Sequence, residues 1–204
     1  MNTAHHFVGL VGCMMLLIAA PLTIFRAPRF KPITILIIFF LMSVLAVVEI
    51  NGLITAAYLR AVTGDLSITS IILLAYFIAE AYTGKTYVSQ GDRKIIRITV
   101  LVTAVLFYPF ALGLEYWDSY AGGFGSWWLY TLLMVMSGLL WYKQAWLPLT
   151  ILLTGILAYV TSLLESDNLW DYLIDPWLVL AMLSLNIINI IRGLKSQPPF
   201  AANK

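Results

Sequence analysis

Glu80 is an ionisable side chain inside an apolar stretch of the chain, and residues of this kind can do chemistry in a membrane. It lies about 13 residues into the stretch 67–84, roughly 20 Å from the start of a helix that rises 1.5 Å per residue. An ionisable group at that depth is costly unless it contacts protein or water, so it is a candidate functional residue. A stripe of polar residues at helical spacing accompanies it: Thr69, Tyr76, Glu80, Thr83 and Tyr87.

The last apolar stretch, 176–192, offers partners for Glu80. It carries Ser184, Asn186 and Asn189, and Asn189 also lies about 13 residues from the start of its stretch. We expect Glu80 and Asn189 to form a hydrogen bond away from water, with Tyr76 and Asn186 beside them. Such a site could hold a proton, a cation or a polar solute. Alternatively, the same hydrogen bond only joins two helices around a protonated Glu80.

Further acidic residues gather on one predicted face of the protein, which we call the outer face. They are Glu115, Asp118, Glu165, Asp167, Asp171 and Asp175. Oxygen ligands suit hard cations, but this spacing does not match an EF-hand loop. The only histidines, His5 and His6, are adjacent and cannot supply a zinc ligand set. We therefore expect no metal site and no cofactor, and an acidic face that attracts cationic solutes.

Glu49 and the residues after it lie near the same face. Glu49 could sit at the mouth of the helical bundle, or it could be an interfacial acid without a specific role. We expect residues 55–65 to form a short interfacial helix that breaks at Gly64. Asp65 is then the expected cap of the next helix.

The composition indicates that lipid surrounds most of the chain. Of its 204 residues, 61% are hydrophobic and 11% are charged, and the mean hydropathy is +0.90. A soluble domain has about 25% charged residues. A helix needs about 20 apolar residues to span a bilayer. Seven apolar stretches come close to this length: 7–25, 33–53, 67–84, 96–113, 127–142, 147–164 and 176–192. We predict an all-α fold with a single seven-helix transmembrane domain over residues 1–194 and a flexible cytoplasmic tail over 195–204.

Basic residues fall in alternate connections between these stretches. They are Arg26, Arg29, Lys31, Lys85, Arg93, Lys94, Arg97, Lys143, Arg192, Lys195 and Lys204. The opposite side has one cation, Arg60, together with the outer acids. By the positive-inside rule the basic side is cytoplasmic, so we predict an external N-terminus and a cytoplasmic C-terminus. The expected location is the cytoplasmic (inner) membrane of a bacterium, as a multi-pass protein.

Three functions fit these features. The leading hypothesis is a small transporter or channel for a cationic or polar solute, with Glu80, Tyr76, Asn186, Asn189 and Glu49 along its pathway. The second is a non-catalytic subunit or assembly factor that binds a membrane protein partner. The third is an enzyme that acts on a lipid-linked substrate at the outer face. Its candidate acids and bases are Glu115, Asp118, Glu165 and Asp171. The cations do not form a basic stripe, so we expect no nucleic acid partner.

Overall fold

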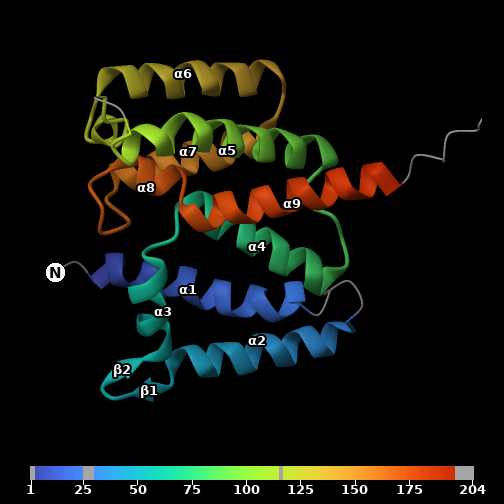
Figure 1. Ribbon diagram of the computed structural model, residues 1–204. Coiled ribbons are helices and arrows are strands. Elements are labelled where there is room, and N and C mark those ends of the chain that lie inside the picture. Colours follow the sequence, from blue (N-terminus) through green and yellow to red (C-terminus); the bar gives the residue numbers. More distant parts are fainter. Residues whose placement is uncertain (1–2, 25–29, 115–116, 196–204) are drawn as a thin grey trace, which may run out of the picture.

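A computed structural model of the chain describes residues 3–24, 30–114 and 117–195, and it describes side chains for 7–24, 30–114 and 117–191. In these residues, helices of 15 to 22 residues run alternately up and down in one bundle (Figure 1). They are α1 (Thr3–Ile24), α2 (Pro32–Val47), α4 (Ile68–Thr83), α5 (Gln90–Ala111), α6 (Trp127–Tyr142), α7 (Trp146–Val160) and α9 (Pro176–Lys195). The prediction of an all-α fold is confirmed.

The short elements gather at one end of the bundle, on the left in Figure 1, which we call the loop-rich end. They are β1 (Glu49–Ile50), β2 (Leu53–Ile54), α3 (Thr55–Thr63), η2 (Tyr120–Gly123) and α8 (Leu169–Leu173). Lys31, Lys85 and Lys143 lie in the connections at the opposite end, which we call the basic end. Residues 196–204 of the predicted tail lie outside the described residues, and Lys195 ends α9.

Local signals in the sequence set most of the helix ends. The predicted interfacial helix is α3, and Gly64 ends it with a φ of 70° that glycine adopts without strain. The prediction that Asp65 caps the next helix is wrong. Ser67 directly precedes α4 in an extended conformation, and its hydroxyl accepts a hydrogen bond from the Ser70 backbone. Asp65 instead binds Arg60.

The predicted span 33–53 is too long, because α2 ends at Val47. The chain then forms a β-hairpin in which Glu49 pairs with Ile54. Asn51 and Gly52 make the turn, with φ angles of 51° and 85°. An Asn-Gly pair favours this two-residue hairpin turn, and here it overrides the apolar character of the flanking residues. Glu49 is exposed on the hairpin and does not extend the helix.

The outside of the bundle is rich in large apolar side chains. Phe40, Val105, Met134 and Leu157 are each between 63% and 79% exposed, and they come from four different helices. Among the described residues, α1 and α5 are long and apolar enough to cross a membrane. The other apolar helical segments have 10–17 residues, among them Pro176–Ile191 of α9. The largest buried cluster lies between α5, α6, α7, α8 and the start of α9.

Candidate functional site

Glu80 does not lie in a polar seam between two helices. It is three residues before the end of α4, and one of its carboxylate oxygens accepts hydrogen bonds from the backbone N–H groups of Tyr87 (2.8 Å) and Val88 (2.9 Å). The other oxygen forms an ion pair with Arg93, in the first turn of α5. Glu80 therefore fixes the connection from α4 to α5 at the basic end.

The predicted contact between Glu80 and Asn189 is wrong. Asn189 is exposed on α9, which packs on α5, and the Glu80 carboxylate binds Tyr87, Val88 and Arg93 instead. Equal depth in the sequence could not reveal which helix would be the neighbour. Tyr76 and Asn186 are half-buried, and among the described residues neither forms a hydrogen bond to Glu80.

Helices α4 and α9 do meet at the loop-rich end, where Asp175 caps α9 and binds Ser67, the cap of α4. One Asp175 oxygen accepts hydrogen bonds from the Ser67 backbone N–H (3.0 Å), the Ser67 hydroxyl (2.6 Å) and the Ser70 hydroxyl (2.5 Å). The other oxygen accepts one from the Leu178 backbone N–H at 2.8 Å. Two positive helix ends thus stabilise one buried carboxylate.

Asp175 therefore differs from the solvent-facing acid expected at this position, because its side chain is only 5% exposed. The sequence carried a signal for this role that we missed. Asp175 stands directly before Pro176, and an acidic cap followed by proline in the first turn is typical of a helix start.

A second polar cluster joins α3 to the segment after α7. The guanidinium of Arg60 contacts both carboxylate oxygens of Asp65, at 2.5 and 2.8 Å, and it contacts Glu165 at 3.0 Å. The hydrogen bond to Asp65 raises the pKa of Arg60 above its ordinary value. Gly9 of α1 passes so close that a Cβ there would overlap this ion pair. Arg60 and its two acids thus hold three parts of the loop-rich end together.

Two further predicted outer acids, Asp171 and Asp118, also form structural hydrogen bonds. Asp171 accepts hydrogen bonds from the hydroxyls of Tyr120 (2.9 Å) and Ser166. Burial and the bond to Asp171 raise the pKa of Tyr120 to about 12. Asp118 caps η2 by accepting from the backbone N–H of Tyr120 at 2.8 Å.

The last two predicted outer acids are Asp167 and Glu115. Asp167 is exposed, and Glu115 lies outside the described residues. Among the described residues, no group of His, Cys, Asp and Glu could hold a metal ion. The acids thus do not converge on a shared catalytic position in this part of the chain.

Hydrogen bonds between side chains and backbone join the segment 117–126 to α8, and we call this contact the loop lock. The Asn168 amide donates to the Tyr120 carbonyl (2.8 Å), and its oxygen accepts from the Trp170 backbone N–H (2.9 Å). The Trp170 indole donates to the Ser119 carbonyl at 3.0 Å, and the Ser119 hydroxyl donates to the carbonyl of Phe107 at 2.8 Å. The loop lock holds Trp170 against the end of α5.

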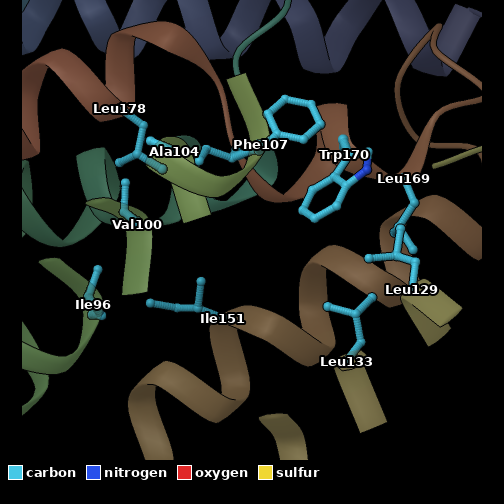
Figure 2. Close-up of a cluster of buried hydrophobic side chains, with 11 residues drawn as sticks. Ile96, Val100, Ala104, Phe107, Leu129, Leu133, Ile151, Leu169, Trp170 and Leu178 are labelled. Atoms are coloured by element: carbon cyan, nitrogen blue, oxygen red, sulfur yellow. The ribbon is translucent and has the colours of Figure 1, made fainter. Parts of the chain in front are cut away.

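Below the loop lock lies an apolar groove of about 500 Å³ between α5, α6 and α7. Figure 2 draws some of the residues that line it, among them Val100 of α5, Leu133 of α6 and Ile151 of α7. Helix α6 packs on α7, and α5 packs on α7 and α9, so α5 and α6 form two walls that stand apart. No pattern in the sequence predicted this groove.

The two ends of the groove differ. At the basic end, Leu140 and Pro148 line it, and Leu140 packs with Ala145 and Leu149 in a buried apolar cluster. At the loop-rich end, its lining includes Trp117, Trp128 and Trp170, and Trp117 is 50% exposed. No charged side chain lines the groove within the described part of the chain. Its uncharged lining within the described residues suits a long apolar molecule.

Comparison with known proteins does not add to this geometry. No protein family, curated protein or solved structure matches the chain. The fold and the site define an all-helical bundle with an apolar groove.

Proposed function

We propose that this chain is a multi-pass membrane protein of a bacterial cytoplasmic membrane that binds the hydrocarbon chain of a lipid in the groove between α5 and α6. The observation that carries the proposal is the groove itself, which is about 500 Å³ in volume and lacks charged lining residues in the described chain. Ligand sites in proteins are commonly apolar clefts of about 300–1,000 Å³. We do not place transport at Glu80, because Arg93 and two backbone amides occupy its carboxylate.

Membrane insertion is supported by the surface and by the sorting of charge. Exposed side chains such as Val105 and Met134 would be costly in water and suit lipid. The basic end carries Lys31, Lys85 and Lys143, whereas the loop-rich end carries buried or paired acids. We propose seven spans with an external loop-rich end. Helices of about 16 residues are about 24 Å long, so the bilayer would thin or flanking residues would snorkel.

The position of the groove supports a lipid as its occupant. In a bilayer the nearest apolar molecules are the lipids themselves, and the groove lies between two helices whose outer faces carry exposed Val105 and Met134. Its lining at the basic end is aliphatic, with Leu140 and Pro148, so a chain would point its methyl end there. The tryptophans at the other end belong to a residue type enriched at the membrane interface. The geometry therefore favours a lipid from the external leaflet.

Filling the groove is expected to displace the bound lipid. Leu133→Trp adds a large side chain to the groove wall, and we expect it to retain several-fold less lipid than the wild type. Met134→Trp is the matched control, because Met134 is the next residue of α6, is 79% exposed and does not line the groove. Mass spectrometry of lipid retained by the purified protein measures the difference.

Two further results make this test decisive. Val100→Phe fills the opposite wall and is expected to lose lipid in the same way, which guards against a folding defect specific to Leu133→Trp. Equal lipid retention by both groove variants and by Met134→Trp would contradict the proposed site.

The proposed orientation can be tested with single cysteines. Cys13 is fully buried, so the wild type is expected to give little background with a membrane-impermeant maleimide. We expect Asp167→Cys, at the loop-rich end, to react in intact cells. Lys143→Cys, at the basic end, is expected to react only after the membrane is opened. The reverse pattern would invert the orientation, and labelling of both in intact cells would contradict the seven-span topology.

A further inference from the structure

We propose that the lipid in the groove is a quinone-type lipid, with an uncharged planar ring that carries carbonyl oxygens on an apolar chain, and that the hydroxyls of Thr99 and Thr103 bind this ring. The inference rests on the proposed function and names the class of its ligand. Three observations support it: two hydroxyls that have no partner among the described residues, the aromatic wall beside them, and a lining in which the described side chains carry no charge.

Thr99 and Thr103 differ from most helical threonines of this chain. The threonine hydroxyl donates to the carbonyl four residues earlier at Thr83, Thr131, Thr150, Thr154 and Thr161. Thr69 of α4, which also lines the groove, forms no side-chain hydrogen bond among the described residues. Among the described residues, Thr99 and Thr103 form no side-chain hydrogen bond, and both line the groove. A hydroxyl without a partner in an apolar region is costly, so these two are suited to bind a ligand oxygen.

The position of the two threonines sets the depth of the ligand's polar atoms. They are four residues apart on α5, so they lie one above the other on the face that lines the groove. Thr103 is eight residues before Ala111, which places it about 12 Å inside the loop-rich end of α5. Polar atoms of the ligand would therefore lie well below the membrane surface. A phospholipid keeps its charged group at the surface, whereas an uncharged head can enter.

The wall beside Thr103 is aromatic. Phe107 and Phe110 follow on α5, and Trp128 and Trp170 line the groove from α6 and α8. Phe107 and Trp170 are in contact, with ring centroids 4.6 Å apart. Planar rings pack well against such a surface, in offset or edge-to-face geometry. The combination of hydroxyl donors, aromatic rings and an uncharged lining thus matches a quinone ring better than a lipid ester.

The test uses decylubiquinone titrated onto the purified full-length protein in detergent micelles, with tryptophan fluorescence as the signal. We expect saturable quenching in the wild type. Thr99→Val/Thr103→Val removes both hydroxyls with little change of shape, and we expect binding to weaken about tenfold. Thr131→Val/Thr150→Val is the matched control and should bind like the wild type, because both hydroxyls already donate to the backbone and neither residue lines the groove.

Further outcomes separate this inference from the proposed function. Thr103→Ser keeps a hydroxyl and should bind more tightly than Thr103→Val, even if the double variant folds poorly. Equal binding by these two variants, or quenching that never saturates, would overturn the quinone inference. A parallel titration with phosphatidylcholine brominated on its chains tests the groove alone. Quenching by the brominated chains without saturable quinone binding leaves only the proposed function, and quenching by neither probe rejects both.

Discussion

Asp175→Ala is expected to lower the free energy of unfolding by about 3–5 kcal/mol. The substitution removes the cap of α9 and leaves the hydroxyls of Ser67 and Ser70 without their acceptor. A lost cap costs about 0.5–2 kcal/mol, and each buried polar group left unsatisfied costs about 1–3 kcal/mol. Because Asp175 joins α4 to α9, the losses fall on two helices at once.

Thermal unfolding of the purified protein measures this effect. For a chain of this size each kcal/mol shifts the midpoint by about 2–4 °C, so Asp175→Ala should unfold roughly 10 °C below the wild type. Asp175→Asn keeps one oxygen acceptor, so its unfolding midpoint is expected to lie between those of the wild type and Asp175→Ala. Asp167→Ala is the control, because Asp167 is an exposed acid of the same segment and its loss should cost less than about 0.5 kcal/mol. A midpoint for Asp175→Ala equal to that of Asp167→Ala would show that the contact of Asp175 with α4 and α9 does not stabilise the bundle.

The elements that the sequence predicted well are those with local causes. The apolar stretch 67–84 corresponds closely to α4, and the short helix before it ends at Gly64 as expected. In both cases the signal lies within a few residues of the boundary. The β-hairpin after α2 also has a local cause, the Asn51-Gly52 turn, but hydropathy alone extended the predicted helix through it.

The predicted site failed because it depended on which helices are neighbours. Glu80 and Asn189 share a depth in their stretches, yet α9 packs on α5, and Arg93 is nearer along the chain. Two side chains at equal depth in a bundle of several helices have many alternative partners. The carboxylate satisfied its hydrogen bonds locally, with the connection that follows α4.

The groove could not be predicted for the same reason. Its lining extends from Thr69 to Ile174 and comes from helices that are far apart in the sequence. Each segment by itself has the composition of an ordinary apolar helix. Only the divergence of α5 from α6, with α7 behind them, creates the space. The hydroxyls of Thr99 and Thr103 become candidate ligand-binding groups only because they line that space.

Gly123→Ala is expected to destabilise the loop-rich end strongly, because a Cβ at this position would overlap the amide of Asn168. Asn168 is fully buried and holds Tyr120 and the Trp170 backbone through its side chain. It cannot move without breaking these hydrogen bonds. We expect a loss of about 2–4 kcal/mol, from backbone displacement and unsatisfied polar groups together.

Gly138→Ala is the control for this prediction, because Gly138 lies inside α6 and a Cβ there would meet no other group within 4 Å. Alanine favours a helix over glycine by about 1 kcal/mol, so Gly138→Ala should unfold at the wild-type temperature or slightly above it. Since the loop lock also holds Trp170 at the end of the groove, Gly123→Ala should weaken lipid retention while Gly138→Ala leaves it unchanged. A stable Gly123→Ala variant with full lipid retention would mean that the loop lock does not shape the groove.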